Sequence, residues 1–370
     1  MRPVIDFSTL PDAVLDDDVL LHRGRPVHEF RDFTAGRAIV PLPQISAIEI
    51  SGADRLTWLH ALSSQHLAQL PAGEATEALI LTPNGHVTAA MRLIDDGERI
   101  IAFVDRACEE TLSEHLKKMV FASRVEITTR PGSVIAFAGE AIAEPPLATE
   151  AVWRDPWPHV DGGTTFTTPG VEPDVTPTAL ALVGDEDLAA FATAHPEAIA
   201  GSLAYEAARI SSWRPQFATE VDERVIPMEL DWLRTAVHLN KGCYAGQETI
   251  ARVVNLGRPP RRLVLLHLDG SAEHLPEPGA AVTFGPKNVG KVTSAVRHPE
   301  LGPIALALVK RTTPPDADLL VDDVPAAQEI IVDPSGESPA RPASRPGDDL
   351  RGARNRGLQK PPTLGGLGKL

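Results

Sequence analysis

Apolar positions in the first third of the chain either alternate or recur at helical spacing, which predicts a mixture of short strands and helices. Residues 45–50 alternate as a strand does, and apolar residues over 54–62 fall near one face of a helix. Two apolar runs flank Asn84-Gly85 and predict a hairpin, with a type I′ turn at that step. The other elements expected here are strands at 99–104, 125–128 and 134–138 and a helix over 112–119.

The middle of the chain has a different pattern. Residues 153–169 are rich in Pro, Gly and Thr and predict a long irregular connection. Two helices are expected after it, over 185–194 and 203–210. Tyr205, Arg209 and Trp213 recur every four residues, so an arginine should lie between two aromatic rings on the second helix. This arrangement favours either a cation–π-stabilised surface or a ligand-binding stripe.

Beyond Arg262 the helical period gives way to short apolar runs separated by Pro and Gly. The expected strands cover 263–268, 281–284, 289–296, 304–309 and 319–324. Their spacing predicts a small antiparallel β-barrel at the C-terminal end of the body. The chain as a whole is therefore predicted to be α+β.

The composition is typical of a soluble globular protein of two or three domains, with 43% hydrophobic and 23% charged residues among 370. A net charge of -15 opposes binding to nucleic acid or to an anionic membrane, and no apolar run is long enough to span a bilayer. Cys108 and Cys243 are too far apart in sequence to suggest a disulfide framework. With an N-terminus that lacks an export signal, this indicates the cytoplasm. We expect no direct nucleic-acid partner and no membrane partner, and we favour a monomer.

Motifs for metals and nucleotides are missing from the sequence. The 12 histidines form no His-x-x-x-His pair and the cysteines no Cys-x-x-Cys pair, so no stable metal site is expected. Two cysteines also cannot supply the four thiolates of a typical iron–sulfur cluster. Neither Gly-x-Gly-x-x-Gly nor a phosphate-loop motif is present, so nucleotide binding has no support.

Residues 334–370 differ from the rest in composition. They contain 6 Pro and 7 Gly, with Leu as the only large apolar residue, which is too little apolar surface to offset the entropy of ordering. We expect a disordered tail. Its 7 Lys and Arg against 3 Asp and Glu make it basic, which suits a solubilising extension or an arm for a partner.

One short motif carries the candidate chemistry. The run Lys241-Gly242-Cys243-Tyr244-Ala245-Gly246-Gln247-Glu248 places a cysteine between glycines, which allow close approach of a ligand or another chain. Lys241 is two residues from Cys243, and a nearby cation favours the thiolate. Gln247 and Glu248 add an amide and a carboxylate to the same loop. Alternatively, Cys243 is a small buried hydrophobe, as most free cysteines are.

This motif resembles the signature of the YgfZ-type folate-binding proteins, relatives of the glycine-cleavage aminomethyltransferase. The resemblance extends over about residues 25–333. Weaker matching stretches occur in the family's order, at 52–59, 81–87, 226–232, 251–258, 289–294 and 302–307. The resemblance implies three domains around a central folate site. Domain one would comprise 25–50 with 131–250, the inserted α+β domain two 51–130, and the C-terminal β-barrel 260–333.

The resemblance also implies which residues meet the ligand, tetrahydrofolate or a derivative. Glu229 resembles the family's pterin-contacting acid by position, and a carboxylate suits the adjacent ring N–H and amino group of a pterin. Cys243 would be the catalytic residue. The other cofactor-binding candidates are Lys241, Tyr244, Gln247, Glu248 and Arg252. The two cations among them would meet the glutamate tail of the folate.

Three functions stay open on these grounds. The family implies a folate-binding accessory protein that supports iron–sulfur cluster assembly or repair, with iron–sulfur client proteins or assembly factors as partners and tRNA modification served indirectly. The first alternative is a tetrahydrofolate-dependent transferase; that branch carries an acidic pair after the hairpin glycine, where residues 86–90 contain no acid. The second alternative is a folate-sensing binding module. The thiol chemistry is also open between holding a transient iron or sulfur species and reducing or transferring sulfur.

Overall fold

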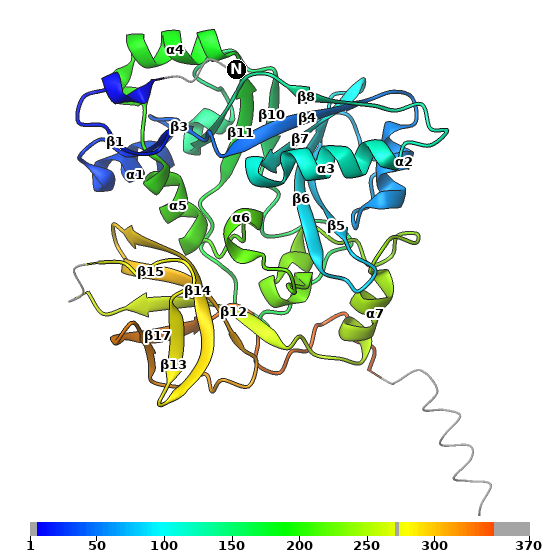
Figure 1. The fold of residues 1–370 in the computed structure, drawn as a ribbon, viewed down its shortest axis with the longest axis vertical. Coiled ribbons are helices and arrows are strands. Elements are labelled where there is room, and N and C mark those ends of the chain that lie inside the picture. The colour runs from blue at the N-terminus through cyan, green and yellow to red at the C-terminus, as the bar shows by residue number, and fades with distance from the viewer. Residues whose placement is uncertain (1–5, 271–273, 344–370) are drawn as a thin grey trace, which may run out of the picture.

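The computed structural model describes residues 6–270 and 274–343, which fold into two larger sheets, a closed barrel and the helices packed among them (Figure 1). In this view the barrel lies at the lower end and both sheets lie above it, with α5 and α6 between them. No helix in these two ranges is long and apolar enough to cross a membrane. The α+β class expected from the sequence is confirmed.

The five-stranded sheet is antiparallel and has the order β5-β6-β7-β4-β8. Its strands span Ala75–Leu81 (β5), Val87–Asp95 (β6), Arg99–Asp105 (β7), Ile45–Ser51 (β4) and Glu126–Arg130 (β8). Two helices, α2 (Arg55–Leu62) and α3 (Arg106–Lys118), pack their apolar residues on one face of it. Because β4 pairs with β7 and β8, residues 45–50 belong to this sheet.

The hairpin between β5 and β6 turns differently from the prediction. Gly85 has a positive φ of 81°, whereas Asn84 does not, and the Gly85 N–H donates to the Thr82 carbonyl at 2.8 Å. A type I′ turn needs a positive φ at both central residues, so Asn84-Gly85 does not form one. Pro83 imposes a negative φ on the second turn position, which favours a type I turn followed by a left-handed glycine.

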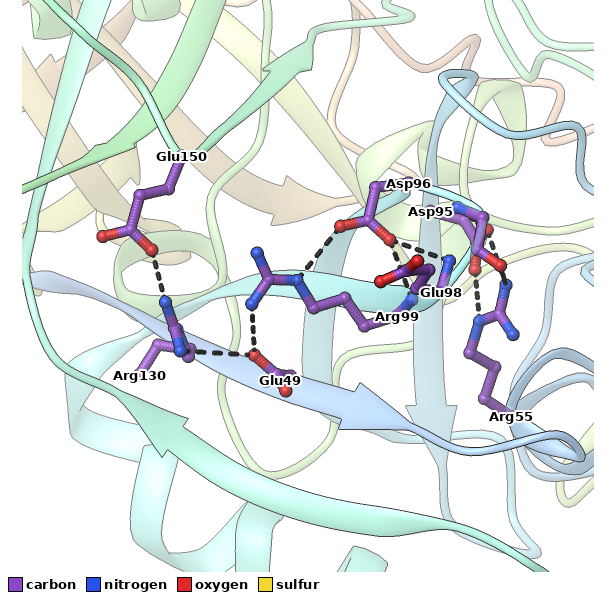
Figure 2. A network of polar contacts seen from close by, with 9 residues as sticks. Glu49, Arg55, Asp95, Asp96, Glu98, Arg99, Arg130 and Glu150 are labelled. Atoms are coloured by element: carbon purple, nitrogen blue, oxygen red, sulfur yellow. Dashed lines mark hydrogen bonds and ion pairs between the residues drawn. The ribbon is translucent and has the colours of Figure 1, made fainter.

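Ion pairs cross several strands of this sheet (Figure 2). Arg99 on β7 meets Glu49 on β4 at 2.9 Å, and Glu49 also meets Arg130 on β8 at 3.6 Å. Arg55 on α2 binds the buried Asp95 at the end of β6 through two nitrogens, at 2.7 and 2.9 Å. The half-exposed pairs on the strands contribute little individually, but the fork-like Arg55–Asp95 contact anchors α2 to the sheet.

The four-stranded sheet has the order β10-β11-β9-β3. Its strands span Ala151–Arg154 (β10), Thr178–Val183 (β11), Ser133–Ala138 (β9) and Val40–Pro41 (β3), and a separate pair joins Val14–Asp16 (β1) to Val19–His22 (β2). The neighbouring helices are α1 (Pro26–Thr34), α4 (Asp185–Ala194) and α5 (Ser202–Ser211). The pattern does not predict β3, which has two residues, or β10, which overlaps the start of the expected irregular connection.

A continuous apolar cluster joins the five-stranded sheet, the helices and the barrel. It runs from Leu79 on β5 through Ile210 on α5 and Met228 to Leu306 in the barrel. The helices of this region are α6 (Phe217–Glu220), α7 (Gln247–Asn255) and the short 3₁₀ helices η4 (Pro227–Leu230) and η5 (Trp232–Arg234). The other 3₁₀ helices are η1 (Phe7–Thr9), η2 (Gly139–Ile142) and η3 (Pro196–Ala198).

The predicted C-terminal barrel is confirmed as a closed antiparallel barrel of the order β12-β15-β14-β13-β16-β17. Its strands span Arg261–Leu268 (β12), Ala281–Phe284 (β13), Lys287–His298 (β14), Gly302–Lys310 (β15), Leu319–Val321 (β16) and Val324–Ile330 (β17). The single strand expected at 319–324 is wrong, because the chain turns at Asp322-Asp323. Both residues have positive φ, 48° and 67°, as a type I′ turn requires.

The packed body continues past 334, where the sequence predicts a disordered tail to begin. Ser338 is buried, and its hydroxyl lies 2.8 Å from that of Thr164. Arg341 donates to the Leu256 carbonyl at 3.3 Å. Residues 334–343 therefore belong to the body, and the rest of the predicted tail, 344–370, lies outside the described residues.

Candidate functional site

Cys243 is exposed on the loop between η5 and α7, so the alternative that it is a buried hydrophobe is wrong. The structure also shows why the motif has a glycine at position 246. Gly246 caps α7 with a φ of 82°, and a Cβ there would lie 2.7 Å from the Thr82 carbonyl oxygen and 2.9 Å from the Gly85 Cα. The tip of the β5–β6 hairpin therefore packs directly against the cysteine loop, and only glycine leaves room for it.

Lys241 turns inward and holds the cysteine loop in place. Its ammonium donates to the carbonyls of His60 and Ser63 at the end of α2, and it lies 4.7 Å from the ring centroid of Tyr244. Burial lowers the pKa of Lys241 to about 8, so the charged form still predominates at neutral pH. In this position Lys241 clamps the loop to α2 and does not reach out to meet a folate tail.

A second set of contacts fastens the chain just before the loop. The Ser64 hydroxyl donates to the Ala236 carbonyl, and the Ser64 carbonyl accepts from the His238 N–H at 3.0 Å. The Gln65 amide donates to the Thr235 carbonyl at 2.7 Å. Sequence reasoning missed these residues because the partners are 170 and 172 positions apart and no local pattern links them.

Three imidazoles form a row beside the cysteine loop. The ring centroids of His60 and His66 are 4.9 Å apart, and those of His66 and His238 are 5.3 Å apart. Nδ1 of His60 accepts the Leu67 N–H, and Nδ1 of His238 accepts the Asn240 N–H, both at 3.2 Å. The neutral forms of these two rings therefore carry their proton on Nε2.

The row is electrostatically unfavourable for further positive charge. Burial lowers the pKa of both His60 and His238, and the charge of Lys241 lowers each further. Across residues 6–270 and 274–343, no three His, Cys, Asp or Glu side chains converge on a point as metal ligands do. The loop that carries the exposed thiol thus lies beside this row of imidazoles, through the approach of His60 to Gly242.

The other predicted residues of the motif differ in their surroundings. The Gln247 amide donates to the Lys241 carbonyl at 3.2 Å and so braces the loop. Tyr244 is buried, which raises the pKa of its hydroxyl to about 12, and that hydroxyl has no hydrogen-bond partner among the described residues. Glu248 and Arg252 face solvent on α7, with side chains 87% and 66% exposed, and pair at 2.9 Å. Of the two predicted cations, Arg252 alone faces solvent.

Glu229 is fully buried and already paired within the chain. Its carboxylate accepts from Nε and Nη2 of Arg261 at 2.9 and 2.7 Å, and from the Arg261 backbone N–H at 3.0 Å. A further bond comes from the Ile226 N–H at 3.3 Å. None of these partners belongs to the cysteine loop. A pterin contact at Glu229 would first have to break its pair with Arg261.

A cavity of about 610 Å³ opens beside this pair, on the outer wall of the barrel. It is lined by Asp222, Arg261 and Lys291 among others. Asp222 pairs with Arg261 at 2.7 Å and with Lys291 at 3.1 Å, and these cations hold the pKa of Asp222 well below its usual range. The charged groups that surround the opening are therefore largely engaged with one another.

The predicted Tyr205-Arg209-Trp213 stripe is wrong. Helix α5 ends at Ser211, so Trp213 lies beyond it, with a φ of 57°. Arg209 is buried and pairs with Glu206 and Glu220, at 2.6 and 2.9 Å. The neighbours of the Arg209 guanidinium are thus carboxylates, and not the two aromatic rings that the helical spacing predicts.

Buried polar side chains gather where the five-stranded sheet meets α5, α6 and the barrel. Glu220 accepts from Arg209 at 2.9 Å, from the Gln216 N–H at 2.8 Å and from the barrel hydroxyl of Ser294 at 2.8 Å. Asp105, at the end of β7, accepts from the Gln216 amide at 3.2 Å, and burial raises the pKa of Asp105. The sequence does hold a signal for this cluster, since Asp105 is a polar end to the apolar run 100–104.

Comparisons with known proteins agree with this architecture. The profile of the glycine cleavage T-protein C-terminal barrel domain matches residues 261–347. "Putative transferase At1g60990, chloroplastic" of Arabidopsis thaliana is 28% identical over 279 residues, which cover 71% of this chain and 62% of that protein. "tRNA-modifying protein YgfZ" of Aliivibrio fischeri is 24% identical over 274 residues, which cover 71% of this chain and 81% of that protein.

A solved structure gives the fold class. Glycine cleavage system aminomethyltransferase T from Bartonella henselae matches 87% of this chain and 93% of its own, with a TM-score of 0.67 at 14% identity. The fold is therefore aminomethyltransferase-like. Within that class, the chain is a relative of proteins named YgfZ, and the resemblance drawn from the cysteine motif is confirmed.

Proposed function

We propose that this chain is a tetrahydrofolate-binding accessory protein of the cytoplasm that supports iron–sulfur cluster assembly or repair, and tRNA modification through iron–sulfur enzymes. The observation that carries the proposal is the exposed thiol of Cys243 on an ordered loop. Lys241 binds this loop to the end of α2, and Gly246 packs against the β5–β6 hairpin. A free thiol held in place at the surface is accessible to a partner protein. The tRNA part is supported by the names of the YgfZ relatives.

A histidine lies close to the cysteine loop. The Nε2 atom of His60 lies 3.8 Å from a Cβ built on Gly242, the residue next to the thiol. Because Nδ1 of His60 accepts from the Leu67 N–H, the neutral ring carries its proton on Nε2 and faces the loop as a hydrogen-bond donor. The thiolate is the form of cysteine that transfers sulfur or exchanges disulfides, so Cys243 is the group that acts on an iron–sulfur client.

The residues present fit a folate best at the centre of the molecule. Buried polar atoms of Arg92, Asp105 and Gln216 have no hydrogen-bond partner among the described residues, whereas Glu229 is satisfied by Arg261. Arg252, on α7, is the exposed cation that would meet a glutamate tail in exchange for its surface pair with Glu248. When bound, tetrahydrofolate supplies the one-carbon and redox chemistry of its reduced ring, and the protein binds and orients it.

The test is rescue of an iron–sulfur enzyme in cells that lack this gene. Wild type and Cys243→Ala are returned at matched protein levels, and the activity of a tRNA methylthio-transferase is measured. We expect wild type to restore activity and Cys243→Ala to leave it at the level of the deletion. Cys108→Ala is the matched control, because that thiol is buried on α3 and should be dispensable.

The outcomes separate the parts of the proposal. Equal rescue by wild type and Cys243→Ala would keep the pathway and reduce the cysteine to a packing role. No defect in the deletion strain would remove the iron–sulfur role altogether.

The fold also favours a second candidate, a tetrahydrofolate-dependent one-carbon transferase. Residues 86–90, which follow the hairpin glycine where that branch carries its acidic pair, contain no acid. Without an acid there, we expect purified protein to transfer no methylene group from an aminomethyl donor to tetrahydrofolate. Robust transfer would replace the accessory role by a catalytic one.

A further inference from the structure

One phenylalanine is far more exposed than any other large apolar side chain among the described residues. Phe121, on the loop between α3 and β8, is 82% exposed, whereas the others reach at most 49%. Its backbone is also unusual, with a φ of 45°. A positive φ is rare for a bulky residue and costs free energy, and an apolar ring in water gains nothing in return. Packing within the chain therefore does not account for this residue.

The loop holds Phe121 in a fixed position. The Ser123 N–H donates to the Val120 carbonyl at 2.9 Å, which closes a turn with Phe121 as its first central residue. The Arg124 N–H then donates to the carboxylate of Asp54, at the start of α2, at 2.8 Å. Glycine or asparagine is usual at a turn position with a positive φ. An aromatic side chain held at such a position has little freedom left to lose when it binds a partner.

The charge around Phe121 is positive, although the chain as a whole is acidic. Residues 117–125, which we call the Phe121 loop, contain three Lys and Arg and no Asp or Glu. Two of these cations, Lys118 and Arg124, have side chains that are each 75% exposed even in their ion pairs. A surface that matches this loop therefore offers an apolar pocket together with carboxylates.

The same chain carries such a pocket at a different place. A cavity of about 620 Å³ opens between η1 and α4, a size that admits an aromatic side chain. Apolar side chains and three carboxylates line it, and none of its described lining residues is a cation. These carboxylates form no ion pair with a Lys or Arg in residues 6–270 and 274–343. The apolar walls include Leu10, Ala189 and Pro196, and the carboxylates are Asp6, Asp185 and Glu186.

We infer that Phe121 of one chain inserts into the η1–α4 cavity of a second copy, with the cations of the Phe121 loop facing the carboxylates of that cavity. The two halves of the contact belong to different parts of the chain, because α3 packs on the five-stranded sheet and α4 on the four-stranded one (Figure 1). The contact is therefore head-to-tail, and each copy has one half free for a further neighbour. A contact built on a single anchor buries less area than a stable dimer does, so the association is weak and depends on concentration.

Sedimentation velocity of the full-length chain over about a hundredfold range of concentration measures this association. Wild type should shift from the monomer to larger species as the concentration rises, and added salt should shift it back. Phe121→Gly removes the ring and suits the positive φ, so it should stay monomeric with a urea midpoint no lower than that of wild type. Ala189→Arg fills the cavity and adds a cation to it, and should also stay monomeric.

A mixture of the two variants tests the head-to-tail geometry. Phe121→Gly keeps an intact cavity, and Ala189→Arg keeps an intact Phe121 loop. An equal mixture should therefore regain one contact and form a dimer and nothing larger. A mixture that stays monomeric would overturn the inference, as would a wild type that is monomeric at every concentration. Circular dichroism of each variant shows that a loss of association is not a loss of folding.

Two controls separate this contact from other kinds of association. Phe284 on β13 is also an exposed phenylalanine, at 39%, but it lies in neither half of the contact. Phe284→Ser should associate as wild type does, and an equal loss in Phe284→Ser and Phe121→Gly would count against the inference. A chain that stops after residue 343 should also associate. If it does not, the basic segment beyond 343 is the occupant of the cavity and the inference fails.

Discussion

The two cysteines show how strongly position decides the chemistry of one residue type. Cys243 is exposed on the motif loop, whereas Cys108 is buried on α3. Burial, with a contribution from Asp105, raises the pKa of the Cys108 thiol to about 12. Because the thiolate is the reactive form, Cys108 is chemically silent in the folded chain.

We expect one thiol per native chain to react with dithiobis(nitrobenzoate) at neutral pH, and two after unfolding in guanidinium chloride. The reactive thiol is Cys243, because Cys108 is neither accessible nor ionised. The absorbance of released thionitrobenzoate gives both counts. In Cys243→Ala the rapid reaction should disappear, and two fast thiols in the native chain would contradict the burial of Cys108.

Lys241 allows a prediction about the clamp. Lys241→Met keeps the apolar stem but leaves the carbonyls of His60 and Ser63 without their donor, which should cost about 1–3 kcal/mol in the free energy of unfolding. Urea unfolding gives the value. Lys118→Met removes an exposed pair with Glu114 and should change the same quantity by less than about 0.5 kcal/mol. Equal stability of wild type and Lys241→Met would show that the clamp does not stabilise the fold.

Between elements, the close approach of the β5–β6 hairpin to the start of α7 depends on a glycine at each side. A Cβ on Gly85 would lie 2.9 Å from Thr249 on α7, just as one on Gly246 would lie 2.7 Å from Thr82 on the hairpin. Each glycine has a positive φ as well. Backbone conformation and lack of space are therefore two separate reasons for the same residue type.

Two substitutions separate these reasons. Gly73 has a φ of 86°, close to the 82° of Gly246, but nothing lies within 4 Å of a Cβ built on it. Gly73→Ala should cost about 1–2 kcal/mol of stability from the left-handed conformation alone. Gly246→Ala has the same backbone strain, and its Cβ also collides with the Thr82 carbonyl. The free energy of unfolding measured in urea should therefore fall by at least about twice as much as in Gly73→Ala. Equal decreases in the free energy of unfolding would show that the hairpin moves away from the added Cβ at no cost.

The histidine row joins α2 to the chain before the cysteine loop and makes that junction sensitive to acid. The pKa values of His60 and His238 are lowered from 6.5 in the folded chain. As the pH falls below 6.5, the unfolded chain takes up protons that the folded chain does not, so the free energy of unfolding falls. Well above pH 7 the two rings are neutral in both states and contribute no slope.

We therefore expect the urea midpoint to drop between about pH 6.5 and 5, and this drop to be smaller in His60→Asn and His238→Asn. The comparison variant is His195→Asn, which changes an exposed histidine outside the row. A profile that is the same in all four proteins would place the acid sensitivity elsewhere.

Local pattern was sufficient for elements but not for the contacts between them. The barrel strands before 319 and the helix over 112–119 follow from local pattern. The two-residue β3 has no period to detect. The partners of Glu229 and the neighbours of Lys241 are set by chain segments far away in sequence, and no spacing rule contains that information.

At the scale of the whole molecule, one apolar cluster runs through the sheet, the helical segments and the barrel. The chain that follows the barrel returns to this body: Glu337 pairs with Arg258 at 3.0 Å, and Ser338 lies against Thr164. The last described residues therefore cover the junction between the barrel and the segment before it.

Two truncations test where the body ends. A chain that stops after residue 343 should have the thermal midpoint of the full chain, because every contact named here is kept. A chain that stops after residue 333 loses the contacts of Ser338 and Arg341 and should melt several degrees lower, as a loss of about 1–2 kcal/mol implies. Identical thermal midpoints for both truncations would show that residues 334–343 do not stabilise the folded body.

The fastening of the cysteine loop to residues 63–66 has a consequence for the newly made protein. The partners are 170 and 172 residues apart, and contacts of that separation form late because a long loop has to close first. A nascent chain therefore cannot present its ordered thiol until most of it has left the ribosome. A damaged chain that opens this junction loses the ordered loop again, so a positioned sulfur is found only on intact molecules.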